Sequence, residues 1–154
     1  MAGVTIEFED RKALAAIGAA VAVLRSPDAM LRDMGEELLI IHRKRFQAQT
    51  SPDGEKWQAL SPAYLRRKKK NRDKILVLDA YLRNTLRYQI EGGDLFFGTD
   101  RPYGAIHQFG GKAGRKGATD IPPRPWLGIG LADAEKLEAI AKRHLDRALG
   151  AGRA

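Results

Sequence analysis

The sequence contains no cysteine, and none of its apolar runs approaches the length of a membrane span. Without cysteine, disulfide frameworks, thiolate zinc sites and cysteine nucleophiles are excluded. A membrane-spanning helix needs about 20 consecutive apolar residues. The first ten residues are acidic where a secretory signal peptide is basic, and they lack its long apolar stretch. We therefore expect a protein of a reducing cytoplasm that makes no contact with membranes.

Patterns that carry catalysis or metal binding are also missing. The glycines at 110–111 lack the Gly-Lys-Ser/Thr of a phosphate-binding loop, and the pair at 128–130 lacks the third glycine of a dinucleotide fingerprint. The acidic residues are dispersed, and no histidine has a second metal ligand at helical spacing. The three histidines are His42, His107 and His144. We predict no enzyme, no cofactor and no metal site, with surface or packing roles for His42 and His144.

The composition is that of an ordinary globular domain. The 154 residues are 44% hydrophobic and 30% charged, which is neither a disordered nor a membrane composition. No internal repeat or linker divides the chain. We therefore predict a single domain over residues 1–154.

The net charge of +8 is concentrated in one short segment. Residues 66–74 hold seven cations and one acid, Asp73, so this segment carries most of the excess charge of the chain. A basic segment favours an acidic partner, which is often nucleic acid. Because no aromatic residue is interleaved within it, recognition of single strands by base stacking is not favoured. Two interpretations stay open: contact with a phosphate backbone, or a solvated segment that meets an acidic protein.

Hydrophobic periodicity predicts two long helices in the first third of the chain. Residues 4–8 alternate as a half-buried strand does, and an apolar stripe then predicts a helix over 10–25. Ser26-Pro27 has the pattern of an N-cap followed by proline at the first helical position. The second stripe continues through about Phe46 and predicts the central core helix.

Shorter elements follow, with turn signals between them. Ser51-Pro52-Asp53-Gly54 predicts a turn, Ser61-Pro62 predicts the start of a short helix, and Asp79 is a candidate cap for another. Residues 86–98 predict a β-hairpin around a Gly-Gly turn. We expect flexible basic loops at 66–74 and 110–119.

The last third predicts an extended segment followed by a helix. The prolines within 121–127 exclude a helix there. A final amphipathic helix runs from Leu131 to about Ala148 and is ended by Gly150, with a loose tail over 150–154. The fold class predicted is α+β, with two or three long helices packed against a small antiparallel β-sheet.

Four clusters join large apolar anchors to turns or constrained loops. Their aromatic members either pin loops onto the sheet or fill pockets on a neighbouring subunit. The cluster positions are Phe46, Pro52, Asp53, Gly54, Trp57, Leu78, Leu82, Tyr103, Ile106, His107, Gln108, Phe109, Gly110, Ile121, Pro122, Arg124, Pro125, Trp126 and Leu127.

In the order and spacing of these clusters the chain resembles the phage virion morphogenesis family, the Mu-like group of tail-completion proteins. The matching motifs are Phe-x-x-Gln followed by Pro-Asp-Gly-x-x-Trp-x-x-Leu, Leu-x-Leu-Asp-x-x-Leu, Tyr-x-x-Ile-His-Gln-Phe-Gly and Ile-Pro-x-Arg-Pro-aromatic-Leu-Gly. They extend over about residues 30–145. The first 25 residues match least.

The resemblance implies a structural virion protein at the head–tail neck or the head-proximal tail end of a tailed bacteriophage or prophage. It implies an α+β homo-oligomer that forms a ring, usually a hexamer, and that meets head connector or stopper proteins and tail tube or terminator proteins. No catalytic residues come with it. The expected locations are the virion neck and, during assembly, the host cytoplasm.

A ring around a DNA channel gives the basic segments a function. The candidate contacts to channel DNA or a protein partner are Arg66, Arg67, Lys68, Lys69, Lys70, Arg72, Lys74, Lys112, Arg115 and Lys116. We predict that the Trp126 segment and the first helices contribute to the ring interfaces. The alternative function is a basic nucleic-acid-binding module without catalysis.

Overall fold

Three long helices and two short hairpins make up the described part of the chain. The computed structural model describes residues 11–151, so the strand predicted at 4–8 lies outside the described residues. In chain order the elements are α1 (Arg11–Arg25), α2 (Asp28–Ala48), α3 (Pro62–Arg67), α4 (Tyr81–Asn84), β1 (Arg87–Glu91), β2 (Asp94–Gly98), α5 (Gly104–Phe109), β3 (Gly111–Ala113), η1 (Arg115–Gly117), β4 (Thr119–Ile121) and α6 (Leu131–Ala151). The fold class is α+β, as the sequence predicts.

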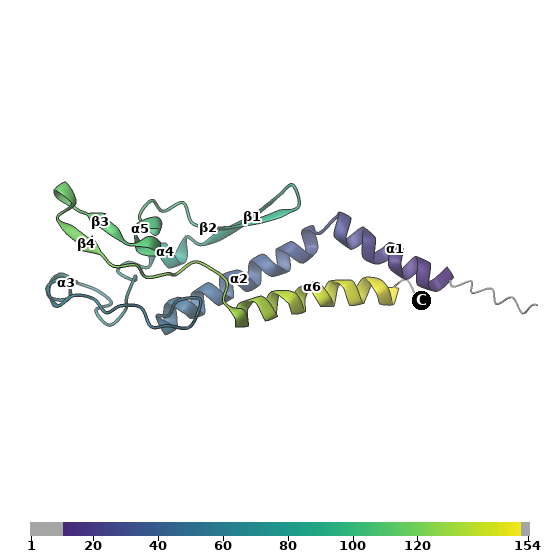
Figure 1. Cartoon of the computed structure of the whole chain (residues 1–154), viewed down its shortest axis with the longest axis horizontal. Helices are drawn as coiled ribbons and strands as arrows, with labels where there is room; N and C mark the ends of the chain where they lie inside the picture. The colour runs from purple at the N-terminus through teal and green to yellow at the C-terminus, as the bar shows by residue number, and fades with distance from the viewer. Residues whose placement is uncertain (1–10, 152–154) are drawn as a thin grey trace, which may run out of the picture.

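The molecule is elongated, with its helical end opposite its hairpin and loop end. Helix α2 runs along the middle, α6 lies beside it, and α1 continues beyond the start of α2 and packs on α6 (Figure 1). The β1–β2 hairpin lies along α2, while α3 and the β3–β4 hairpin lie at the end away from α1 (Figure 1). The predicted sheet is thus two separate two-stranded antiparallel ladders.

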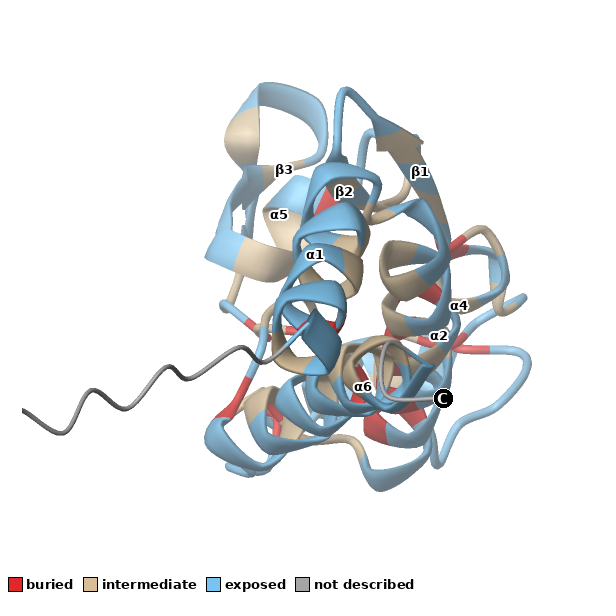
Figure 2. Cartoon of the chain, turned by 90° about the vertical axis from the view of Figure 1, so that its right-hand side faces the viewer, coloured by how far each residue is buried: buried red, intermediate tan, exposed pale blue. Residues whose placement is uncertain are grey.

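Helix α1 buries small residues and exposes large ones. Ala16 is buried in the contact that α1 makes with α6. The aliphatic residues of the predicted stripe face away from it: Leu14 is 70% exposed and Leu24 60% exposed. Figure 2 shows most of the surface of α1 as exposed, whereas buried residues occur on α2 and on the segments packed against it.

The main core lies where α2 meets the segments after it. Its buried cluster contains Phe46, Trp57, Val77, Leu82, Leu86 and Trp126. Leu39, Phe97 and Leu127 pack against it. The C-terminal end of α2 is therefore the scaffold on which the motif segments are assembled.

Several predicted boundaries are confirmed. The Ser61 hydroxyl accepts a hydrogen bond from the backbone N–H of Tyr64, and Pro62 is the first residue of α3. The Ser51–Gly54 turn closes through a 3.0 Å hydrogen bond from Gly54 N–H to the Ser51 carbonyl. The β1–β2 hairpin forms within the predicted range, with Tyr88 opposite Phe97.

Other boundaries differ from the prediction. Pro27 is itself the N-cap of α2, so Ser26 does not cap it, and Ala80 in a left-handed conformation precedes α4 in place of Asp79. Helix α6 continues through Gly150 to Ala151 because that glycine keeps a helical conformation. The predicted loop 110–119 contains the β3–β4 ladder and the turn η1, since strands of three residues are too short to show an alternating pattern.

Candidate functional site at the basic end

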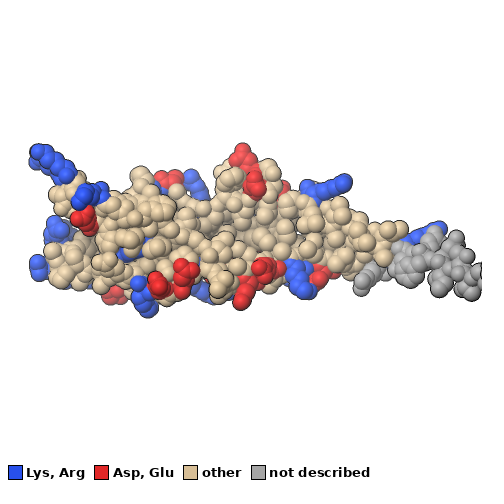
Figure 3. Space-filling model, viewed as in Figure 1, with Lys and Arg blue, Asp and Glu red and all other residues tan. Residues whose placement is uncertain are grey.

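The two basic segments predicted from the sequence lie at the same end of the molecule. Helix α3 and the loop that follows it carry the first segment, and the β3–β4 hairpin carries the second (Figure 1). In the space-filling view Lys and Arg gather at this end, opposite α1 (Figure 3). The fold therefore joins segments about 45 residues apart in the sequence into one surface, which we call the basic end.

Lys68 is buried within this surface and does not face solvent. Its side chain is at the centre of the loop, where its ammonium group donates hydrogen bonds to the backbone carbonyls of Asn71 and Lys74. Burial lowers the pKa of Lys68 from its ordinary value. Lys68 is thus not among the exposed candidate contacts, because its charge holds the loop together, which no sequence pattern within a basic run reveals.

The other nine candidate cations are exposed, and two of them are paired. Lys70 forms a 2.9 Å ion pair with Asp79, and Lys112 forms a 3.0 Å ion pair with Asp120. Within residues 11–151 no ion pair involves the remaining seven, which are Arg66, Arg67, Lys69, Arg72, Lys74, Arg115 and Lys116. These seven residues supply the unneutralised charge of the basic end.

The motif tryptophans hold this end together from inside. Phe46 contacts the Trp57 ring edge-on, with centroids 5.4 Å apart, and lies 6.2 Å from the Trp126 ring. The Trp57 indole N–H donates to the carbonyl of Pro125 at 2.8 Å, and the Trp126 indole N–H donates to Gly104 at 3.0 Å. Trp126 is 3% exposed, so its own core buries it and the predicted Trp126 interface does not form through this side chain.

Gln108 and Arg124 connect the motif segments through backbone groups. The Gln108 side-chain oxygen accepts hydrogen bonds from the N–H groups of Trp126 and Leu127, each at 2.9 Å. Arg124 donates to the carbonyls of Gln58 and Ala59 at 2.7 and 3.1 Å. Burial lowers the pKa of Arg124 from its ordinary value. Its guanidinium N–H groups donate to these backbone carbonyls, not to an acidic partner. These motif residues are structural supports of the basic end.

The motif glycine Gly110, and Gly130 just after the last motif, allow close approaches that any larger residue would prevent. Gly110 has a positive φ of 74°, and a Cβ there would lie 2.9 Å from the Ile121 carbonyl oxygen. A Cβ at Gly130 would lie 2.1 Å from the Pro52 carbonyl oxygen. The first contact joins α5 to β4, and the second seats the Pro-Asp-Gly turn against the start of α6.

The remaining aromatic motif residues behave differently from the tryptophans. Phe109 is 79% exposed and Tyr103 is 39% exposed, so they do not pin loops onto a sheet as one interpretation predicted. His107 is half-buried, with its Nδ1 atom unpaired, and burial followed by the nearby charge of Arg124 lowers its pKa. Phe109 and Tyr103 are available to a neighbour.

Sequence reasoning missed a buried arginine that joins the first half of the chain to the last helix. Arg45 donates to the carbonyls of Trp126 and Gly128 and forms a 2.6 Å ion pair with Asp133. Arg45 lies four residues after Ile41, on the buried stripe of α2. A charged residue at a position of this apolar stripe was the sequence signal that could have identified it. Of the two roles predicted for His42, surface or packing, its full burial on α2 fits packing.

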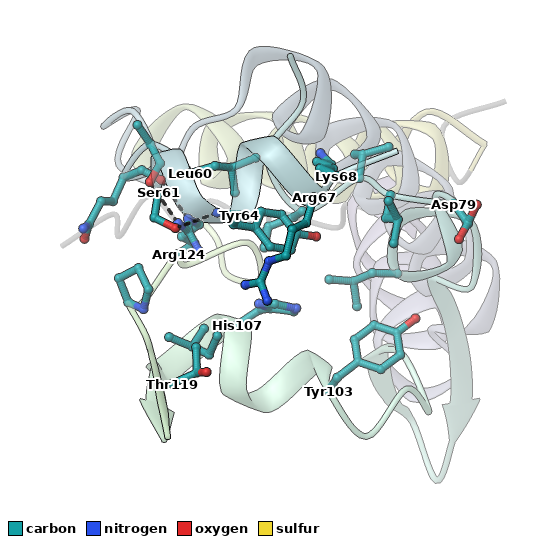
Figure 4. A pocket seen from close by; sticks show the side chains of 18 of the residues that line it. Leu60, Ser61, Tyr64, Arg67, Lys68, Asp79, Tyr103, His107, Thr119 and Arg124 are labelled. Carbon is teal, nitrogen blue, oxygen red and sulfur yellow. Dashed lines mark hydrogen bonds between the residues drawn. The ribbon is translucent and has the colours of Figure 1, made fainter. Parts of the chain in front are cut away.

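A cavity of about 600 Å³ opens at the basic end. Side chains of α3, α5 and β4 and of the loop before α4 surround it (Figure 4). Arg67 extends into it from α3 toward His107 on α5 (Figure 4). Much of the remaining wall is apolar or aromatic, from Leu60, Tyr64, Leu76, Leu78, Tyr81, Tyr103, Ile121 and Pro122.

The described residues provide no arrangement typical of a catalytic or metal centre. Within residues 11–151 no three His, Asp or Glu side chains are grouped so as to hold a metal ion. In the same residues no single helix meets the length and hydropathy of a membrane span; the bent pair α1–α2, with 57° between its axes, does so jointly. The surface offers charge, an apolar cavity and exposed aromatic residues, which are means of binding.

Comparison with known proteins agrees with this description. The family model of the phage virion morphogenesis family matches residues 8–146. The chain is also 47% identical over 53 residues to the Mu-like prophage FluMu G protein 2 of Haemophilus influenzae. That match covers 34% of this chain and 38% of the relative, so the similarity spans well under half of either protein. No solved structure matches the chain.

The family match includes every motif segment, from the end of α2 to the start of α6, and the structure shows these segments assembled into one core. The chain belongs to the phage virion morphogenesis family.

Proposed function

We propose that this protein completes the tail of a phage or prophage at its head-proximal end, as a ring-forming structural subunit of the head–tail neck. The observation that carries the proposal is the family match over residues 8–146, which makes the protein one of phage morphogenesis. The finer assignment to the neck is supported by the exposed aliphatic, aromatic and basic side chains, which are suited to binding.

Ring formation needs two different surfaces that meet head to tail and close by rotation. Helix α1 offers one of them, because Leu14, Ile17, Val21 and Leu24 present a row of exposed aliphatic side chains. Exposed apolar patches of this kind mark sites of protein contact. The basic end offers a second surface at the opposite end of the molecule (Figure 1). We propose a hexamer that contacts connector or stopper proteins on one side and tail tube or terminator proteins on the other.

Deletion of the gene from its phage or prophage tests the proposal by electron microscopy of the particles that form. We expect DNA-filled heads beside unattached tails, or tails of abnormal length. The wild-type gene supplied in trans restores joined particles. Normal, infectious particles from the deletion strain would contradict a neck function.

A second function is supported by the seven unneutralised cations of the basic end. A surface of this charge binds phosphate backbones without sequence preference. As a nucleic-acid-binding module the isolated protein would bind DNA tightly, with a steep dependence on salt. A neck subunit needs weak, non-specific contact at most, so the strength of binding by the isolated protein separates the two functions.

A further inference from the structure

The cavity at the basic end combines an apolar wall, a cation and a strand edge. Arg67 extends into the cavity, and no ion pair within residues 11–151 neutralises it. The two acids of the lining, Asp79 and Asp120, are both neutralised, by Lys70 and Lys112. An occupant with negative charge and apolar side chains fits this chemistry.

The strand β4 lies in the wall of this cavity. Thr119, Asp120 and Ile121 line it, and β4 pairs with β3 along one edge. Along the other edge β4 has no strand partner among residues 11–151. An open strand edge beside an apolar pocket is the arrangement that binds an added extended segment, with backbone hydrogen bonds for affinity and pockets for alternate side chains.

One segment of this chain has the matching chemistry. Residues 4–10 read Val-Thr-Ile-Glu-Phe-Glu-Asp, with apolar side chains at every second position through Phe8 and three acidic residues in the last four. In an extended conformation Val4, Ile6 and Phe8 share one face. This face complements the apolar wall, and the acids complement Arg67 and the unpaired cations around it.

The same segment cannot reach the cavity of its own chain. Ten extended residues span at most ~33–36 Å. Helices α1 and α2, of 15 and 21 residues, are about 22 and 31 Å long, and with 57° between their axes they separate the start of α1 from the end of α2 by roughly 45–50 Å. The cavity lies beyond that end of α2, at the opposite end of the molecule from the start of α1 (Figure 1).

We propose that residues 4–10 of one copy bind along β4 in the cavity of the next copy and link the subunits head to tail. Because donor and acceptor surfaces differ, the contact is heterologous and closes into a ring when the rotation between copies is right. The inference rests on the ring of the proposed function and names the segment and the receptor surface that form it.

A synthetic peptide of residues 1–12 with a fluorescent label, added to the full-length protein, tests the receptor surface by anisotropy. We expect saturable binding that weakens at least 10-fold in Arg67→Glu and in Leu78→Glu, two exposed positions of the cavity wall. The matched control, Arg25→Glu, makes the same change of charge on α1 and leaves binding unchanged. A peptide with Glu7, Glu9 and Asp10 replaced by lysine does not bind. Binding that is equal in all variants, or none, overturns the proposal.

The absence of native cysteine allows a second test in which both chains are complete. Thr5→Cys protein and isotopically labelled Thr119→Cys protein are mixed and oxidised, and disulfide-linked heterodimers are identified by mass. We expect them in clear excess over those formed by Thr5→Cys with Ala139→Cys, an exposed position on α6. Equal yields contradict the proposal. So does a disulfide formed within one chain of the Thr5→Cys/Thr119→Cys double variant.

The neck function and the exchange of residues 4–10 between copies can be disproved independently of each other. Separate heads and tails in the deletion strain, without the Thr5–Thr119 crosslink, leave the neck function intact and overturn the segment exchange. The crosslink together with normal particles in the deletion strain leaves the contact between copies and overturns the neck function.

Discussion

At the scale of single residues, Arg45 determines how the two halves of the chain are joined. Its side chain is 4% exposed, its charge is paired with Asp133, and it donates to two backbone carbonyls of the segment before α6. A buried charge that loses its partner is strongly destabilising, although replacing the whole pair with apolar groups often costs little.

Asp133→Ala is therefore expected to lower the free energy of unfolding by about 3–5 kcal/mol, because it leaves the Arg45 guanidinium buried without its carboxylate. The double variant Arg45→Met/Asp133→Leu is expected to recover a large part of this loss. Urea denaturation followed by circular dichroism measures both. On the same helix, Asp146→Ala removes the exposed pair with Lys142 and is expected to cost less than about 1 kcal/mol. Equal losses of unfolding free energy in Asp133→Ala and Asp146→Ala would show that burial does not determine how much each ion pair stabilises the fold.

His42 is expected to make stability depend on pH. Burial lowers its pKa to about 4, while its Nδ1–H donates to the Leu38 carbonyl at 2.7 Å. In the unfolded chain a histidine binds a proton near pH 6.5, whereas the folded chain does so only near pH 4. Stability is thus retained above pH 6.5 and declines as the pH falls from 6.5 to 4, by about 2 kcal/mol between pH 7 and pH 5.

Urea titrations of the wild type and of His42→Leu at pH 7 and pH 5 measure this contribution. The leucine variant is expected to lose the His42 part of the decline, since it has no proton to bind at this position. His107, whose pKa is also lowered by burial, leaves a smaller decline of the same sign. A decline of the same size in the variant and the wild type would show that His42 is not its source.

At the scale of elements, the long periodic segments were predictable and the short irregular ones were not. The apolar stripes located α1, α2 and α6, and the Gly-Gly turn located the β1–β2 hairpin, because each signal repeats over several residues. The cap at Ala80 was missed because its left-handed conformation is imposed by packing around the core, not by its side chain. The β3–β4 ladder was missed because three-residue strands rich in glycine and charge carry no periodicity.

The same limit applies to the candidate site. The charge run located the basic end, since charge is visible in the sequence. The burial of Lys68 and the convergence of α3 with the β3–β4 hairpin were not visible, because both depend on contacts between distant segments. The pairing of Arg45 with Asp133 was not visible for the same reason: the partner carboxylate lies 88 residues further along the chain.

The packing of α2 on β1 gives a prediction that compares two helical glycines. A Cβ at Gly35 would lie 2.6 Å from the Tyr88 ring, whereas a Cβ at Gly18 in α1 would meet nothing within 4 Å. Gly35→Ala is expected to destabilise the protein by about 1–3 kcal/mol through overpacking. Gly18→Ala is expected to stabilise it by about 0.5–1 kcal/mol through helix propensity. Thermal unfolding of both variants, and of the wild type, decides whether the hairpin packs this tightly; stabilisation by both would contradict the contact.

At the scale of the whole molecule, charge is arranged along the long axis. The seven unneutralised cations of the basic end are at the end away from α1, and the exposed aliphatic stripe of α1 is at the other (Figures 1 and 3). The two ends therefore present different kinds of surface, one aliphatic and one basic.

The salt dependence of DNA binding measures what the basic end contributes. Lys69→Gln/Arg72→Gln/Lys74→Gln is expected to reduce the slope of log K against log salt by about 3 for duplex DNA, because each phosphate contact contributes roughly 0.9. Arg25→Gln/Lys136→Gln/Arg147→Gln, with the same net charge, keeps the wild-type slope. Titrations at several salt concentrations provide both slopes. If the two triple variants have the same slope, binding depends on net charge and not on this surface.

The packing of α1 on α6 has a consequence for biosynthesis. These helices are the first and last elements described, and more than 100 residues separate them in the chain. During translation α1 emerges long before its packing partner exists, so Ala16 stays exposed until α6 has left the ribosome. The helical end closes only after α6 has been made, and a nascent polypeptide that stops before residue 131 presents that surface to chaperones and proteases.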